Sequence, residues 1–512
     1  MTYFISIMIY LMALIAVGIY KIGSIKNSED FMVAGRTLPW YILVGTLLAT
    51  WMGSGSLFSG AGLGYRNGPA GLWSSAGAWL GIALIYFIAK RIRNFGKVTV
   101  PDIFLIRYGP AASILATITT VIAYTTIVSY QFRGGGKVLS LVSDGLVSME
   151  QGIIITAVFA ISYTVIAGMF SVVYTDVVNG ILMMIGTILA LIFLVDKVGG
   201  ISEVFSVAEA AGKLQLFGNW SSERVGDVSG PVIAISFFVP TMLLLMGDAN
   251  MYQRIFSAKD GGSAKKAVLF WIIGVIVLES AISMLGLTGY VAVTKEIIPD
   301  LVAQEQSSLL NHTEITMLEA KQAASESIIP AIARFAGLPM FLGLLLVSTM
   351  MAIIVSTADS FLLIPATNLT RDVYLRYLNQ NASEKNILLI SRTLVLFLGL
   401  ISYLLVSQFG TVLSAAFTAY NIYGTSITPA LLAAFLWKRA TKQGAIASIL
   451  TGSTVTIIWT YLLPSWSGFT NLNPFLQELT YPAASLSILS LIIVSFLTPA
   501  PTKESLKPFF ID

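Results

Sequence analysis

The apolar residues of this chain fall into long runs that are separated by short polar stretches. A helix needs about 20 predominantly apolar residues to cross the hydrocarbon core of a membrane. Runs of this kind recur with no long soluble domain between them, so we expect one all-α transmembrane domain over residues 1–512. The pattern predicts thirteen transmembrane helices, at 3–20, 40–60, 72–89, 110–132, 151–168, 177–195, 231–247, 267–292, 337–362, 386–407, 411–436, 444–463 and 480–498.

The charged loops give this array a direction. If the N-terminus lies outside, most of the 30 Lys and Arg residues fall on the inner side. Cytoplasmic loops carry such an excess of positive charge. We therefore expect a multi-pass protein of the cell membrane, with its N-terminus outside and its C-terminus in the cytoplasm.

Composition narrows the function. Hydrophobic residues make up 56% of the chain and charged residues only 11%, against about 25% charged in a soluble domain. The chain has no cysteine, and its one histidine, His312, lies in a polar stretch, which argues against thiolate and histidine metal sites. No catalytic constellation is apparent and the net charge is only +4. We predict no enzyme, no organic cofactor and no nucleic-acid partner.

The first polar interruption is "ATWMGSGSLFSG", Ala49 to Gly60, midway along the second run. Glycine costs about 1 kcal/mol relative to alanine inside a helix, so this stretch favours a broken helix. A break frees backbone carbonyls, which are good ligands for a hard cation. The alternative is a close helix–helix contact through small residues.

The second interruption is "VSTADSFLL", Val355 to Leu363, near the end of another run. Ser356, Asp359 and Ser360 share one helix face because they are spaced i, i+3, i+4. Thr357 lies beside that face. Oxygen ligands without sulfur or imidazole suit a hard ion such as Na⁺. Hydroxyls bonding back to their own helix are the alternative, but that leaves Asp359 without a partner.

Further acids interrupt other runs. Asp248 and Asn250 lie in "MGDANMYQR", where a salt bridge or cap near Arg254 is the alternative to a functional role. Asp176, in "VVYTDVVNG", can serve as an N-cap. Glu279 lies near the middle of the eighth run, where a carboxyl is either protonated or paired with a polar group on another helix.

Several stretches together resemble the sodium:solute symporter family. The motifs on which this resemblance rests are "STADSFLLIPATNLTRDVY", "ITPALLAAFLWKRATKQGAIAS", "YTDVVNG" and "YQRIFSAKD". The resemblance implies the leucine/sodium transporter-like fold. One extra helix (3–20) comes first, inverted five-helix repeats cover 40–195 and 231–436, and two further helices lie within 444–498.

The resemblance also implies where sodium binds. The first sodium site would use the carbonyls of Ala49, Met52 and Ile353 and the hydroxyls of Ser356 and Thr357. A second sodium site, present in some members, has matching positions at Asp176, Ser356, Asp359 and Ser360. Asp359 departs from the serine found there in members with a well-characterised second site, and protons could compete for it.

By resemblance, the solute lies beside the broken core helices. These positions do not agree on one chemistry, so a sugar, an amino acid and a carboxylated solute all stay open. The matching positions are Ser54, Ser56, Trp73, Ser74, Tyr130, Gln131, Arg133, Asp248, Tyr420 and Asn421. We predict a secondary active transporter that couples inward sodium movement to solute uptake by alternating access. A solute sensor and a passive channel are the alternatives. Sensors of this fold usually carry a C-terminal signalling domain, and only about a dozen residues follow Pro499.

Overall fold

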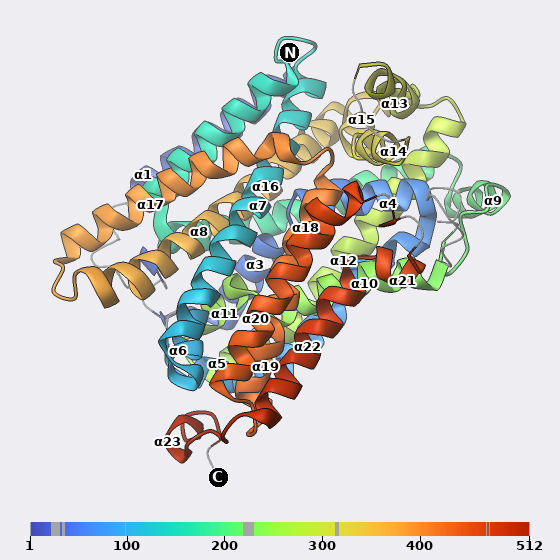
Figure 1. The fold of residues 1–512 in the computed structure, drawn as a ribbon. Helices are drawn as coiled ribbons and strands as arrows, with labels where there is room; N and C mark the ends of the chain where they lie inside the picture. Colours follow the sequence, from blue (N-terminus) through green and yellow to red (C-terminus); the bar gives the residue numbers. More distant parts are fainter. Residues whose placement is uncertain are drawn as a thin grey trace.

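The computed structural model describes residues 2–21, 31–32, 36–97, 99–218, 230–312, 317–466, 468–469 and 472–510. Almost all of these residues are helical (Figure 1). The helices are α1 (Thr2–Lys21), α3 (Trp40–Trp51), η3 (Gly55–Ser59), α4 (Gly60–Asn67), η4 (Gly68–Gly71), α5 (Leu72–Asn94), α6 (Val100–Tyr108), α7 (Pro110–Val142), α8 (Met149–Lys197), α9 (Ile201–Ala210), α10 (Gly230–Gly247), α11 (Ala249–Ser257), α12 (Gly261–Thr294), α13 (Leu301–His312), α14 (Met317–Ser325), α15 (Ile328–Phe335), α16 (Met340–Asn368), η6 (Leu369–Leu378), α17 (Glu384–Leu405), η7 (Val406–Gln408), α18 (Val412–Ser426), α19 (Thr428–Leu436), α20 (Lys442–Ile457), η8 (Ile458–Leu462), η9 (Leu463–Ser465), α21 (Pro474–Gln477), α22 (Thr480–Leu497) and α23 (Lys503–Leu506).

The ends of these helices follow from local sequence. Thr99, Thr411 and Thr441 each accept a backbone N–H at the start of a helix, as N-cap residues do. Ser148 and Gln151 form a capping box that starts α8. These caps fix where the long apolar helices begin, and the apolar faces then decide how the helices pack.

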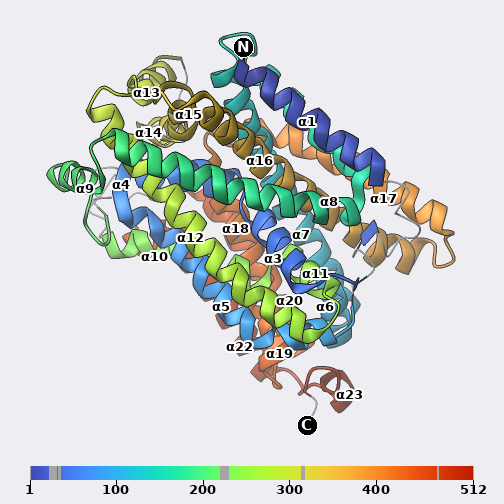
Figure 2. The ribbon, with the colours of Figure 1, turned by 180° about the vertical axis from the view of Figure 1, so that it is seen from behind.

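The long helices form one bundle in which distant segments lie side by side. α16 packs against α7 and α8, α10 packs against α5, and α20 packs against α22. Figures 1 and 2 show α1 and α17 on one flank, and α13 to α15 at the end opposite α23. The two ends of the chain lie at opposite ends of the molecule in both views.

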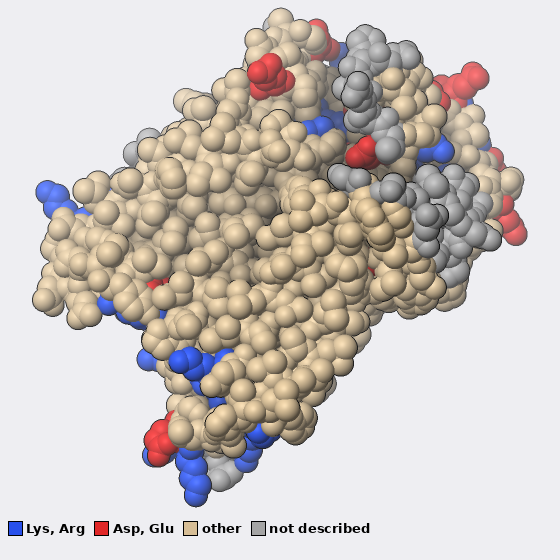
Figure 3. Space-filling view, viewed as in Figure 1, with Lys and Arg blue, Asp and Glu red and all other residues tan. Residues whose placement is uncertain are grey.

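The described part of the chain contains ten helical stretches that are long and apolar enough to cross a membrane, together with two shorter apolar helices. Large apolar side chains such as Phe87, Leu404 and Leu497 lie exposed on their outer faces. Figure 3 shows a broad band of uncharged surface, with Lys and Arg gathered near the end that carries the C-terminus. The membrane-protein prediction is confirmed, whereas the number thirteen stays a prediction.

α8 contains the two predicted runs 151–168 and 177–195, and the separation between them is confirmed. Its membrane-spanning stretches are Met149–Ile166 and Val172–Lys197. They are joined at Gly168, whose backbone is not helical (φ 56°, ψ 178°), a conformation that glycine adopts without strain. A Cβ there would also lie 2.5 Å from the ring of Phe31. Asp176 therefore lies inside a helix, and its interpretation as an N-cap is wrong.

The two longest gaps between the predicted helices, 196–230 and 293–336, are partly helical in the residues that the structure describes. They contain α9 and the short helices α13, α14 and α15. The turn between α14 and α15 carries Glu326, whose buried carboxylate accepts the N–H groups of Val412 (3.2 Å) and Leu413 (2.9 Å). Burial raises the pKa of Glu326, and the positive charge of Lys137 opposes that shift. Glu326 thereby ties this turn to the start of α18.

Candidate functional site

The second apolar run is a broken helix, as its glycines predict. α3 ends at Trp51, and Met52 has extended backbone angles (φ −74°, ψ 106°). The chain then resumes as the π-helical turn η3 and continues into α4. Ser54 donates its backbone N–H to Gln131 Oε1 at 2.8 Å, so a side chain from α7 satisfies the backbone at the break.

Hydroxyls of α16 meet the carbonyls at the end of α3. Thr357 Oγ1 lies 2.7 Å from the carbonyl oxygen of Met52 and 3.4 Å from that of Ala49. Ser356 Oγ lies 3.3 Å from the Ala49 oxygen. Ile353 lies one turn earlier on α16, and all five residues are buried. The hydroxyls thus reach across to another helix rather than to their own, and the predicted ligands of the first sodium site lie at one junction.

A buried ion pair occupies the region of the predicted second sodium site. Asp176 Oδ2 lies 3.2 Å from Arg254 Nη2, and both side chains are fully buried. Asp176 also accepts hydrogen bonds from Thr46 (2.6 Å) and Ser356 (2.5 Å). Arg254 donates to Ser360 Oγ at 2.6 Å. The guanidinium therefore stands between Asp176 and Ser360, where a cation would otherwise be needed to neutralise the carboxylate.

Asp359 has a different partner. Its Oδ1 accepts a hydrogen bond from Thr164 Oγ1, on α8, at 2.8 Å. Removing one partner of such a buried pair leaves a polar group unsatisfied, at a cost of about 1–3 kcal/mol. The structure brings Asp176, Ser356 and Ser360 around Arg254, and it places the Asp359 carboxylate on Thr164. A second sodium ion at these residues stays a prediction.

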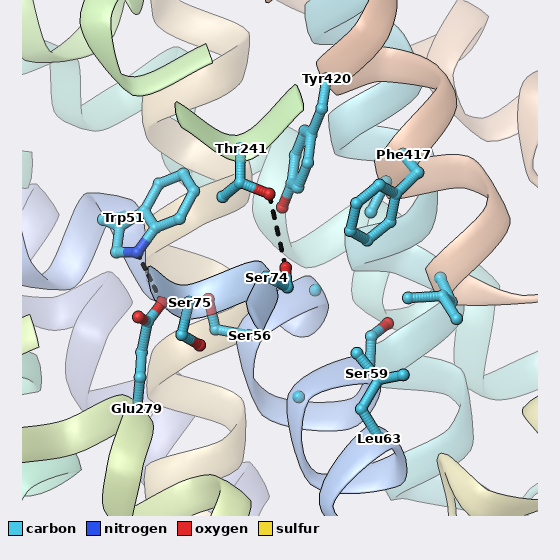
Figure 4. A pocket seen from close by; sticks show the side chains of 14 residues that line it. Trp51, Ser56, Ser59, Leu63, Ser74, Ser75, Thr241, Glu279, Phe417 and Tyr420 are labelled. Atoms are coloured by element: carbon cyan, nitrogen blue, oxygen red, sulfur yellow. Dashed lines mark hydrogen bonds between the residues drawn. The ribbon is translucent and has the colours of Figure 1, made fainter. Parts of the chain in front are cut away.

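A narrow pocket lies beside the helix break. The space inside it that a water molecule can reach is about 20 Å³, room for about one water, so the pocket is nearly closed in this structure. Figure 4 shows Glu279 and Trp51 on one side, Phe417 and Tyr420 on the other, and the hydroxyls of Ser56 and Ser75 between them. The full lining is Trp51, Gly55, Ser56, Ser59, Gly60, Leu63, Ser74, Ser75, Thr241, Glu279, Leu413, Ala416, Phe417 and Tyr420.

Three of the predicted solute residues line this pocket: Ser56, Ser74 and Tyr420. Ser74 Oγ lies 3.4 Å from the hydroxyl of Thr241, and Tyr420 lies 3.5 Å, oxygen to oxygen, from Tyr130. Tyr130 thus stands directly behind one pocket wall. Ser54 is buried at the break, and Gln131 holds its backbone.

The other predicted solute residues do not line this pocket, and each has a structural hydrogen-bond partner. Trp73 donates its indole N–H to the Leu216 carbonyl (2.8 Å), and Arg133 donates to the carbonyls of Phe409 and Gly410. Asn421 donates to the Phe417 carbonyl. Asp248 caps α11 by accepting the N–H of Asn250 (2.7 Å), and it also accepts the hydroxyl of Tyr124. The cap considered as an alternative for Asp248 is therefore confirmed, and a role for any of these four in solute binding stays a prediction.

Glu279 lines the pocket, and the sequence analysis gave this acid no role in binding. Its two oxygens accept the indole N–H groups of Trp51 (2.8 Å) and Trp79 (2.7 Å), and the residue is 5% exposed. The expectation that Glu279 pairs with polar groups on other helices is confirmed. A carboxyl in mid-membrane usually marks a functional position, and that was the only signal for it in the sequence.

Comparison with known proteins agrees with this geometry. A family model described as the sodium:solute symporter family matches residues 31–452. The osmoregulated proline transporter OpuE of Bacillus subtilis is 26% identical, with 99% of this chain and 96% of that protein covered. The sodium/proline symporter of Escherichia coli is 24% identical (98% and 94% covered), and the sodium/glucose cotransporter of Vibrio parahaemolyticus is 25% identical (96% and 90% covered).

Solved structures share the fold. A Na⁺-coupled sialic acid symporter in a substrate-bound, outward-open state superimposes with a TM-score of 0.78 at 18% identity, covering 98% of this chain and 99% of that one. MhsT in complex with L-phenylalanine gives a TM-score of 0.53 at 13% identity, covering 90% and 97%. The leucine/sodium transporter-like fold is confirmed, and the relatives are transporters, not enzymes. Because the family model spans most of its length, the chain belongs to the sodium:solute symporter family.

Proposed function

We propose that this protein couples sodium entry at the junction of α3 and α16 to the uptake of a small polar solute held in the neighbouring pocket. Its family and its sodium-coupled structural neighbours support the general activity, sodium-coupled secondary transport. The observation that carries the residue assignment is the approach of Ser356 and Thr357 to the carbonyls of Ala49 and Met52. Ile353 completes the proposed site.

The geometry offers a direct route for coupling. Ala49 and Met52 supply proposed sodium ligands at the end of α3. Trp51, which lies between them, and Gly55, which follows them, line the pocket. An ion that draws the end of α3 toward α16 also fixes one wall of the pocket. Solute in the pocket fixes the same segment in return, and such mutual stabilisation is the reciprocity that thermodynamic linkage requires.

The arrangement of the chain supports alternating access. We propose that α3 to α8 and α10 to α19 form the two inverted repeats predicted at 40–195 and 231–436, with α1, α20 and α22 outside them. Rocking of one group of helices against another around a central site is the usual mode of such folds. We also propose a cell-membrane location with the N-terminus outside; the positive surface near the C-terminal end supports this orientation.

Flux into proteoliposomes tests the proposal. An inward sodium gradient should drive accumulation of at least one solute from a panel that begins with proline, glucose and sialic acid, the solutes that its relatives' names give. Replacing sodium with potassium, or collapsing the gradient with a sodium ionophore, should abolish accumulation. Solute entry that is equal in both salts would instead identify a passive channel.

A further inference from the structure

Among the residues that the structure describes, Glu279 is the only charged one that lines the pocket beside the helix break. It comes from α12, and its carboxylate is held by indole N–H groups from two other helices, α3 and α5. Each of its oxygens accepts one of these N–H groups, and the Ser75 hydroxyl also donates to the carboxylate. Three donors still leave lone-pair capacity on a carboxylate, which has about four acceptor positions. The carboxylate is therefore fixed in position without being saturated.

No cation compensates this charge within the described part of the chain. The pocket lining contains no Lys, Arg or His, and no described Lys or Arg forms an ion pair with Glu279. By contrast, Asp176 is neutralised by Arg254. A carboxylate at this depth in a membrane needs a cation or a proton, so the pocket is built either for a positively charged occupant or around a protonated acid.

The walls next to Glu279 are aromatic. The rings of Trp51 and Tyr420 lie 6.2 Å apart between centroids, and those of Tyr420 and Phe417 lie 5.5 Å apart. Aromatic faces attract organic cations such as ammonium groups. A bare sodium ion needs a shell of oxygen ligands instead, and two of the groups around this carboxylate are N–H donors, which repel a metal ion.

We propose that the transported solute carries a positively charged nitrogen, which binds Glu279 against the rings of Trp51 and Tyr420. This inference rests on the proposed function, because it takes the pocket as the solute site. It favours amino acids and their N-methylated derivatives over sugars and over carboxylates without a cationic nitrogen. Trp51 links this site to sodium, since it both holds Glu279 and adjoins Met52 at the end of α3.

Matched ligands test the role of the charge. Thermal stabilisation of the purified protein in sodium is measured with a panel of amino acids and N-methylated amino acids. The same measurement uses their nitrogen-free isosteres, for example cyclopentanecarboxylate in place of L-proline, and D-glucose and sialic acid. At least one cationic compound should bind about tenfold or more tightly than its isostere, because a hydrogen bond to a charged group is worth at least a factor of ten. Binding of only a sugar or a nitrogen-free acid, or no binding by any cationic compound, would overturn the proposal.

Two variants complete the test with the best cationic compound. Glu279→Gln keeps the size of the side chain and should weaken its binding about tenfold or more. Glu203→Gln makes the same chemical change at an exposed residue, paired with Lys295 on the surface, and should have no effect. If Glu279→Gln binds the compound as tightly as wild type, the acid is protonated and the proposal is wrong.

Sodium provides the reference that separates the two proposals. Glu279→Gln should still be stabilised by sodium over potassium when no solute is present, which also shows that the variant folds. If sodium does not stabilise the wild-type protein more than potassium does, the proposed function is wrong. Intact sodium stabilisation combined with tight binding of a neutral sugar contradicts only the inference about Glu279.

Discussion

Thr357 offers the sharpest test of the sodium site. Its hydroxyl lies 2.7 Å and 3.4 Å from two carbonyl oxygens at the end of α3 and has no further hydrogen-bond partner among the described residues, whereas Ser356 also bonds Asp176. Changing Thr357 therefore perturbs the proposed site with the fewest side effects. Thr357→Val removes the oxygen and nearly keeps the volume, while Thr357→Ser keeps the oxygen and removes the methyl group.

The size of the effect follows from the ligand count. The hydroxyl is one of five proposed ligands, and an interaction of a neutral group with a charge is worth about 1.5–3 kcal/mol. Since 1.4 kcal/mol is tenfold in affinity, Thr357→Val should raise the half-saturating sodium concentration about 10- to 100-fold. Thr357→Ser should stay close to wild type, apart from lost contact near Gly53, where the methyl group of Thr357 packs.

The assay is a sodium titration of thermal stability at constant ionic strength, with potassium as the replacement ion, repeated as sodium activation of uptake. A Ser356→Ala/Thr357→Val double variant should shift the titration further than either change alone. If Thr357→Val titrates like the wild type and Thr357→Ser in both assays, the hydroxyl is not a ligand and the site assignment fails.

Three further outcomes are expected. The predicted second sodium site is tested by the Hill coefficient of sodium activation. Two coupled ions should give a wild-type coefficient near two that falls in Asp359→Asn. Since Arg254 already neutralises Asp176, a coefficient near one that Asp359→Asn leaves unchanged would refute the second site. A cysteine introduced within 199–218 should react with an impermeant reagent in intact cells, and one within 438–442 should react only after permeabilisation. The chain has no native cysteine to interfere. The reverse labelling pattern would refute the proposed orientation. The pKa of Glu326 is raised by burial, so the folded state holds its proton more tightly than the unfolded state, and this contribution to stability is present at low pH and lost as pH rises through the raised pKa. Wild-type thermal stability should accordingly decline with rising pH relative to Glu326→Gln, and parallel curves would contradict that assignment.

The sequence alone determined the class of the protein and its helices. Apolar runs of membrane-spanning length are a one-dimensional property, because each helix satisfies its own backbone hydrogen bonds within the membrane. The glycines of "GSGS" likewise encode the break after Trp51 locally, since they weaken the helix wherever it packs. The oxygen-rich face with Ser356 and Thr357 follows from helical spacing, and the structure places it against that break.

Only the tertiary structure decided which polar groups meet. The pairs Asp176–Arg254 and Glu279–Trp51 join residues far apart in the chain, and no local pattern specifies such partners. Trp73 and Arg133 looked like solute ligands, yet their donors are used by loop carbonyls. A buried polar group takes whichever partner the packing of apolar faces brings near it, because leaving it unpaired is costly. For that reason the charge of the pocket, on which the proposed kind of solute rests, emerges only when α3, α5, α12 and α18 are assembled.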